Sequence, residues 1–112
     1  MSNCLFCKMI RGEIKPKIEY EDEQVIAIHD MNPQAPHHIL VIPKKHIAKV
    51  AETEAADSRT LGNIVFQARQ IALRHGWEDY RLVFNNGTGA GQSVFHIHLH
   101  LLAGRRMAWP PG

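Results

Sequence analysis

The feature that most constrains this sequence is a stretch, residues 92–102, in which three histidines alternate with aliphatic residues. A period of two predicts a β-strand with one face in the core, because successive side chains of a strand point to opposite faces. We therefore expect His96, His98 and His100 to share one face, and the aliphatic residues between them to pack in the core. Titratable groups at three successive positions of one face indicate a functional site.

A glycine-rich loop, residues 85–91, leads into this stretch with the sequence Asn-Asn-Gly-Thr-Gly-Ala-Gly. Glycines let backbone N–H groups approach an anion closely, because they carry no Cβ. Imidazoles beside such a loop have two chemistries open to them. Three neutral histidines and a water can form a catalytic zinc site, or one imidazole nitrogen can attack phosphorus as a nucleophile. The anion-binding loop favours the nucleophile.

Among the three histidines, His98 is the best candidate for the nucleophile, because it has a neighbour on each side of its own face. A nucleophilic imidazole must be unprotonated at one nitrogen and held by a hydrogen bond at the other. His96 and His100 would flank it, and would either stabilise charge on the phosphoryl oxygens or fix its tautomer. A well-placed donor of this kind lowers a reaction barrier by about 2–4 kcal/mol.

The pattern His-apolar-His-apolar-His-apolar-apolar, residues 96–102, resembles the signature of the histidine-triad (HIT) superfamily. The segment 91–94 before it, the segment Asp-x-x-Pro-Gln-Ala-Pro-x-His at 30–38 and the run Val-Ile-Pro-Lys-Lys-His at 41–46 resemble that superfamily too. The tail, residues 104–112, is similar to the end of the Hint branch, whose members are purine nucleoside phosphoramidases. The resemblance covers almost the whole chain.

The activity implied by this resemblance is cleavage of the P–N bond of a purine nucleoside 5′-phosphoramidate of the AMP-amine type. The middle histidine, His98, would carry a nucleotidyl-histidine intermediate, and the reaction would need no cofactor. Two alternatives stay open at this point. One is a dinucleoside polyphosphate or adenylyl hydrolase, or a nucleotidyl transferase, of the same superfamily. The other is a nucleotide-binding adaptor with vestigial activity.

The resemblance also implies residues that bind the nucleotide. Ser93 lies at the junction of loop and strand, where its hydroxyl can reach the phosphate or the leaving group. Asp30 is the natural acceptor for the ribose hydroxyls, as acidic side chains are in other nucleotide sites, and His38 looks like a supporting residue. An apolar slot for the purine is expected at positions that could also be plain core. The remaining positions around the phosphate, the purine or the leaving group are Asn85, Gly91, Gln92, Val94, Leu5, Phe6, Met9, Ile28, His29, Met31 and Trp109.

Cys4 and Cys7 form a C-x-x-C pair near the N-terminus. A redox motif would need a thioredoxin-like βαβ context, which is missing here. Half of a structural zinc site is one interpretation, and HIT relatives with such a pair imply His46 and His96 as the other two ligands. Two small buried thiols are the other interpretation. The sequence leaves both open.

Hydrophobic spacing predicts an α+β fold with a meandering antiparallel sheet of about five strands. The expected strands cover residues 18–20, 25–29, 38–43, 81–85 and the histidine stretch. A long amphipathic helix is expected over residues 54–75, with Thr53 as its N-cap and Gly76 just past its end. A short helix is expected over residues 4–10. We expect residues 1–112 to form a single HIT domain, with a C-terminal tail at residues 103–112.

Charge and hydropathy narrow the expected partners and location. The net charge is +2 and the basic residues are scattered, so we expect no nucleic-acid partner. No apolar run approaches the roughly 18 residues of a membrane span, and the start of the chain lacks the pattern of a signal peptide. We therefore expect a cytoplasmic protein with no membrane partner. The stiff, apolar end Trp109-Pro110-Pro111-Gly112 predicts a homodimer in which the tail reaches the partner.

Overall fold

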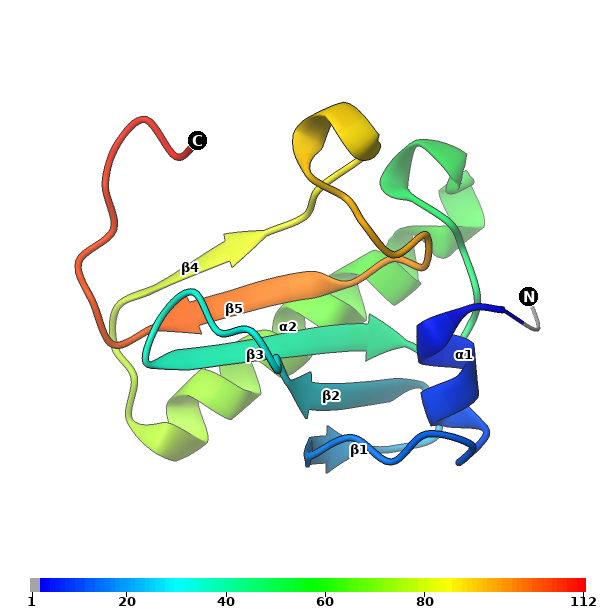
Figure 1. The fold of residues 1–112 in the computed structure, drawn as a ribbon, viewed down its shortest axis with the longest axis horizontal. Coiled ribbons are helices and arrows are strands. Elements are labelled where there is room, and N and C mark those ends of the chain that lie inside the picture. The colour runs from blue at the N-terminus through cyan, green and yellow to red at the C-terminus, as the bar shows by residue number, and fades with distance from the viewer. Residues whose placement is uncertain (1–2) are drawn as a thin grey trace.

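The computed structural model describes residues 3–112 and consists of a five-stranded antiparallel sheet crossed on one face by a long helix (Figure 1). The strands are β1 (Ile18–Glu21), β2 (Val25–His29), β3 (His37–Pro43), β4 (Tyr80–Val83) and β5 (Leu99–Ala103). The helices are the short α1 (Leu5–Ile10) and the long α2 (Ser58–His75). The predicted α+β class is confirmed, with its five antiparallel strands, its long helix and its short N-terminal helix.

The rest of the described chain forms turns and loops between these elements. Three short 3-10 turns lie at Val50–Glu52, Ala55–Asp57 and Thr88–Ala90. Met1 and Ser2, on which the expectation about a signal peptide partly rests, lie outside the described residues. Within residues 3–112, neither helix has the length and apolar character needed to span a bilayer.

The strand order places the histidines in the middle of the sheet. Strands β1, β2 and β3 form a meander, after which α2 carries the chain to the far edge and β5 returns between β4 and β3. The order is therefore β1-β2-β3-β5-β4, and the expected meander covers only the first three strands. His100 of β5 pairs with Leu40 on one side and with Val83 on the other. Neighbours on both sides hold the backbone of β5 in register.

Helix α2 packs against the rear face of the sheet in the view of Figure 1. It buries Ile64, Ala68 and Ile71 at the three- and four-residue spacing of an amphipathic helix, whereas Val65 is 41% exposed. Gly76 ends the helix in the left-handed conformation, at φ 72°, as predicted. The predicted start is wrong, because the helix begins at Ser58. A 3-10 turn precedes it, in which the side chains of Glu54 and Asp57 form a capping box.

The histidine stretch is a strand only in its second half, so the strand expected from residue 92 onward is wrong before Leu99. The side chain of Gln92 explains the difference. Its Oε1 accepts the N–H of Gly87 at 2.8 Å, and its Nε2 donates to the carbonyl of Ala48 at 2.8 Å. These side-chain bonds hold the segment before Leu99 as a loop, so its backbone does not pair with a neighbouring strand. The core side of the predicted pattern still holds, because the aliphatic residues that alternate with the histidines are buried, namely Ile97, Leu99 and Leu101.

The front face of the sheet carries a second, smaller apolar cluster under α1 (Figure 1). Phe6 of α1 packs there against Ile26 and Ile28 of β2 and against Leu40 and Ile42 of β3. The helix covers only one end of this face. The rest of the face is left for a pocket.

Candidate functional site

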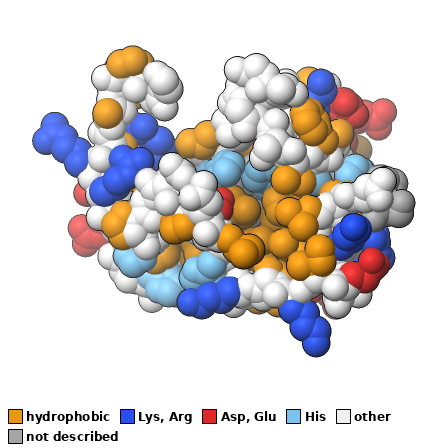
Figure 2. Space-filling model, in the orientation of Figure 1, with side chains coloured by type: hydrophobic (Ala, Val, Ile, Leu, Met, Phe, Trp, Pro, Cys, Tyr) orange, Lys and Arg blue, Asp and Glu red, His pale blue; other side chains and the backbone are white. Residues whose placement is uncertain are grey.

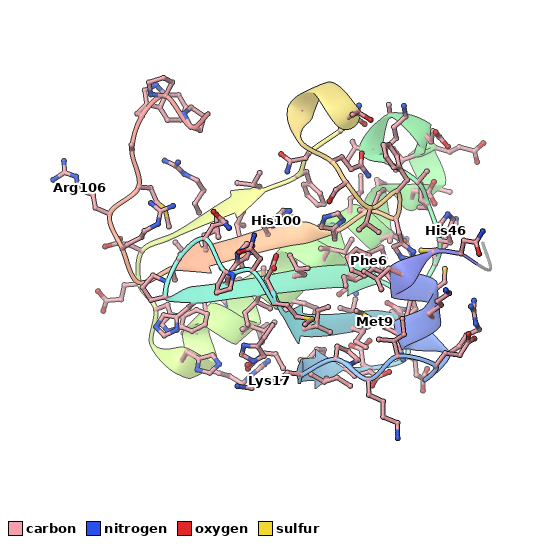
Figure 3. All side chains as sticks on the ribbon, in the orientation of Figure 1. Phe6, Met9, Lys17, His46, His100 and Arg106 are labelled. Carbon is pink, nitrogen blue, oxygen red and sulfur yellow. The ribbon has the colours of Figure 1, made fainter. Side chains whose placement is uncertain are left out.

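A pocket of about 580 Å³ opens on the front face of the sheet, between α1, the end of β2 and the histidine stretch. Figure 2 shows hydrophobic side chains gathered in the middle of this face with histidines beside them, and Figure 3 labels Phe6, Met9 and His100 around it. The pocket is of a size that holds a nucleotide. It brings together many of the residues expected from the sequence, namely Leu5, Phe6, Met9, Ile28, His29, Asp30, Met31, Ser93, Val94, His98 and His100.

His98 has the protonation pattern that a nucleophile needs. Its Nδ1 lies 2.8 Å from the backbone carbonyl oxygen of His96. A carbonyl can only accept, so Nδ1 carries the proton and donates it, and Nε2 keeps a free lone pair. Burial lowers the pKa of His98, so the ring is neutral near pH 7. The ring of Phe6 packs edge-on against it, with the centroids 5.0 Å apart.

A chain of hydrogen bonds gives His100 the opposite tautomer. The backbone N–H of Gln34 donates to Nδ1 of His38 at 3.0 Å, so the proton of a neutral His38 sits on Nε2. That Nε2 lies 2.9 Å from Nδ1 of His100 and 3.4 Å from a carboxylate oxygen of Asp30. His100 therefore accepts at Nδ1 and carries its own proton on Nε2. Burial, together with His98 and His38, lowers the pKa of His100 to about 4.

The imidazole of His96 lies outside the pocket, although the sequence predicts it beside His98. It is fully buried, and its Nε2–H donates to the carbonyl of Pro43 at 2.7 Å. The period-two pattern is misleading here because the backbone around His96 is not a strand. The sequence predicts two roles for a flanking histidine, to stabilise charge on the phosphoryl oxygens or to fix the tautomer of His98. Only the second is open to His96. It fixes the tautomer of His98, and does so through its backbone carbonyl.

Four side chains from distant parts of the chain meet around Nδ1 of His96. Sγ of Cys4 lies 3.4 Å from this nitrogen, Sγ of Cys7 3.6 Å and Nδ1 of His46 3.1 Å. All four ligand atoms lie within 4.8 Å of one another. We call these residues the Cys/His cluster.

The Cys/His cluster fits a zinc ion. Two sulfurs and two imidazole nitrogens are a common structural donor set for zinc. The bond from Nε2–H of His96 to Pro43 leaves its Nδ1 bare, which is how metal-binding histidines are usually oriented. Bound there, a metal would cross-link α1 to the segments that carry His46 and His96.

Asp30, His38 and His100 also lie within 4.8 Å of one another, but their hydrogen bonds do not suit a metal. The amide of Gln34 occupies Nδ1 of His38, so a proton stands on the nitrogen that faces the other two residues. A metal ligand must offer a lone pair at that position. These three residues therefore form a hydrogen-bonded chain.

Several expected residues lie outside the pocket. Gln92 is buried in the loop that it braces, and Trp109 in the tail is 82% exposed. Asn85 and Gly91 lie next to each other in that loop, where Gly91 has a φ of 95° that favours glycine.

The sequence analysis also missed part of the pocket wall: Ile14, Lys15, Pro16, Lys17 and Leu40. The pairing of β1 with β2 could have located some of these residues. It places the carbonyl of Lys17 3.0 Å from the N–H of His29, and so brings this segment to the pocket.

Comparison with known proteins agrees with this geometry. Residues 3–108 match the family model described as "Scavenger mRNA decapping enzyme C-term binding". An uncharacterized HIT-like protein of Synechocystis is 47% identical over 109 residues, which are 96% of each chain. A maize protein named "14 kDa zinc-binding protein" is 47% identical over 114 residues, covering 99% of this chain and 89% of its own.

Solved structures show the same likeness. A HIT family hydrolase from Legionella pneumophila is 52% identical, with a TM-score of 0.95 over 98% of this chain and 100% of its own. A histidine triad protein from Clostridium difficile is 37% identical, with a TM-score of 0.93 over 96% of each chain. The chain therefore belongs to the histidine-triad (HIT) superfamily.

Proposed function

We propose that this protein is a hydrolase that cleaves the P–N bond of purine nucleoside 5′-phosphoramidates through a nucleotidyl intermediate on His98. The observation that carries the proposal is the hydrogen bond from Nδ1–H of His98 to the carbonyl of His96, which leaves Nε2 free beside the pocket. A solved relative named as a HIT family hydrolase supports the reaction class.

In the first step, Nε2 of His98 attacks the α-phosphorus. The bond between phosphorus and the substrate's amine nitrogen breaks as a bond forms between phosphorus and Nε2. The imidazole becomes positive in this intermediate, and the carbonyl of His96 stabilises the charge by accepting from Nδ1–H. The leaving amine takes a proton from the hydroxyl of Ser93, which lines the pocket. In the second step, water attacks the phosphorus and the bond between Nε2 and phosphorus breaks. The proton that the water loses restores the hydroxyl of Ser93, and the nucleoside monophosphate leaves with His98 neutral again.

His100 serves as a neutral hydrogen-bond donor to the phosphoryl oxygens. The chain from the amide of Gln34 through His38 sets its proton on Nε2, on the side away from His38. Its lowered pKa keeps the ring neutral at physiological pH. A neutral donor stabilises the charge of the transition state without adding a cation next to the cationic intermediate.

The nucleoside fits the rest of the pocket. Asp30 uses one carboxylate oxygen to accept the N–H of Asn32 at 2.8 Å, and the other faces His38 at 3.4 Å. The carboxylate is thus held in place at the pocket wall, where it can accept from the ribose hydroxyls. The apolar side chains of α1 and Ile28 supply a slot for the purine.

We also propose that the protein is a homodimer, joined at β4 and the tail. Strand β4 is at the edge of the sheet and has one unpaired side. Arg81 of β4 donates from its guanidinium to the carbonyl of Ala108 at 2.9 Å, so the tail stands beside this edge. A hollow of about 1050 Å³ lies there, lined by Trp77, Tyr80 and Met107 among others. Trp109, two residues after Met107 in the tail, is exposed, as expected of an apolar residue that packs on a partner.

Replacing His98 with alanine removes the nucleophile. We expect turnover of an adenosine phosphoramidate to fall by about a thousandfold or more, because covalent catalysis is lost. Binding of AMP should survive, because Asp30 and the purine slot are unchanged. His75→Ala is the matched control, since His75 at the end of α2 lines neither the pocket nor the hollow beside β4. A His98→Ala variant that keeps more than a few per cent of the activity would rule out the nucleophile. A wild type that binds AMP without turnover would instead indicate the adaptor.

The lowered pKa of His100 predicts a pH-dependent stability. The unfolded residue titrates near 6.5 and the folded one at about 4, so the unfolded chain binds more protons between these values. The stability that depends on a neutral His100 is complete above pH 6.5 and is lost as the pH falls toward 4. At pH 5 we expect a loss of about 2 kcal/mol relative to pH 7.5. Urea titrations should show this extra loss in the wild type and not in His100→Gln. Equal losses in both would contradict the neutral ring.

Removing the tail tests the dimer and its part in specificity. We expect sedimentation equilibrium to show a dimer for the full chain at micromolar concentration. Truncation after Arg106 should change kcat/KM for substrates with bulky amines much more than the affinity for AMP, because the tail would lie beside the leaving group. A monomeric full chain would refute the dimer. Unchanged leaving-group preference after truncation would refute the role of the tail.

A further inference from the structure

The side chains of helix α1 and its N-cap contact two different sites. Its N-cap Cys4 and its buried Cys7 point into the Cys/His cluster. The residues between and after them, Leu5, Phe6 and Met9, form the apolar wall of the pocket (Figure 3). This short helix and its N-cap residue therefore supply half of a metal site and one wall of the substrate pocket.

We propose that metal binding at the Cys/His cluster assembles the purine slot by holding α1 on the sheet, and thereby sets nucleotide affinity without taking part in the covalent step. This inference rests on the proposed function only in assigning the pocket to a nucleotide. It gives the cluster a second role besides general stability.

The first reason is that α1 is weakly held without the metal. A six-residue helix is far too short to be stable by itself. The charged side chains around its end pair locally, Arg11 with Glu13, and so do not tie the helix to the sheet. Phe6 is its one fully buried apolar side chain in the cluster on the sheet; Met9 and Ile10 pack there only partly buried, and Leu5 is 40% exposed. The long-range polar contacts of α1 are those of its two thiols with His46 and His96.

The second reason is that the other half of the cluster is rigid. His96 is fully buried and is bonded through Nε2–H to Pro43, the last residue of β3. His46 follows three residues later, where the next residue, Ile47, accepts the N–H of Ile97 at 2.8 Å. A metal at the cluster would thus join a weakly held helix to fixed parts of the fold. Its loss should free α1 and leave the sheet in place.

The third reason is that the hydrogen bonds that set the tautomers of His98 and His100 do not involve α1, whose Phe6 makes only an apolar edge-on contact with the ring of His98. The tautomer of His98 is set by a backbone carbonyl, and the residue that carries this carbonyl is anchored to Pro43. His100 is set by His38 of β3. Loss of the metal should therefore raise the Kd for the nucleotide much more than it lowers kcat.

The test compares the zinc-loaded wild type, the same protein after chelation and dialysis, and the variant C4S/C7S. Hydrogen exchange of the backbone amides of α1 and the Kd for AMP by calorimetry are the readouts. On metal loss we expect α1 exchange to rise about tenfold or more, while β3 and β5 stay protected. The Kd for AMP and the KM should rise by about tenfold, with kcat within about twofold. Lys8→Ser is the matched control, because Lys8 lies on α1 and supplies no ligand to the cluster.

Three results would overturn the inference. One is a wild-type protein that binds no zinc by elemental analysis. Another is unchanged α1 exchange and AMP affinity after zinc is removed. The third is loss of protection throughout β3 and β5, which would give the metal a general structural role. Failure of the proposed function looks different, because zinc-loaded protein would then bind no AMP while α1 exchange still reported on the cluster.

Discussion

The hydrogen bond from Nδ1–H of His98 to the carbonyl of His96 is the interaction on which the site depends. It decides which nitrogen of His98 can attack, and it can stabilise the ring when that ring becomes positive. The bond requires a fixed carbonyl, and the fold provides one. His96 is buried and anchored to Pro43, and the chain then enters β5 between two neighbouring strands. The proposed nucleophile is thus oriented by backbone that the sheet holds rigid.

The three histidines therefore differ in their surroundings, although the sequence presents them as equivalent. His96 belongs to the Cys/His cluster, and His98 lines the pocket. His100 forms a hydrogen bond with His38 on the neighbouring strand β3. Each ring has one nitrogen committed to a partner, and that commitment determines what the other nitrogen can do. His96 and His98 are each left with a bare nitrogen, which we propose serves a metal in His96 and attacks phosphorus in His98, and His100 is left with a proton to donate.

Local patterns predicted most of the fold and part of the site. Alternation located the core residues around His98, and helical spacing located the buried face of α2 and its end at Gly76. The patterns failed where contacts between distant parts of the chain determine the local structure. The bonds of the Gln92 side chain replace strand pairing before Leu99, and the thiol of Cys4 lies 92 positions from His96 in sequence but in contact with it. The purine slot and Asp30 were expected from family resemblance, since an apolar stripe alone is equally typical of core.

Trapping the covalent intermediate tests the central claim most directly. Wild-type protein would be mixed with an adenosine phosphoramidate labelled at the phosphorus, denatured within milliseconds, and digested for mass spectrometry. The account predicts a labelled adenylyl group on the peptide that contains His98, at Nε2, stable to alkali and labile to acid as a phosphoramidate bond is. Turnover with no covalent label at any time point, or a label on Ser93, His96 or His100, would contradict it.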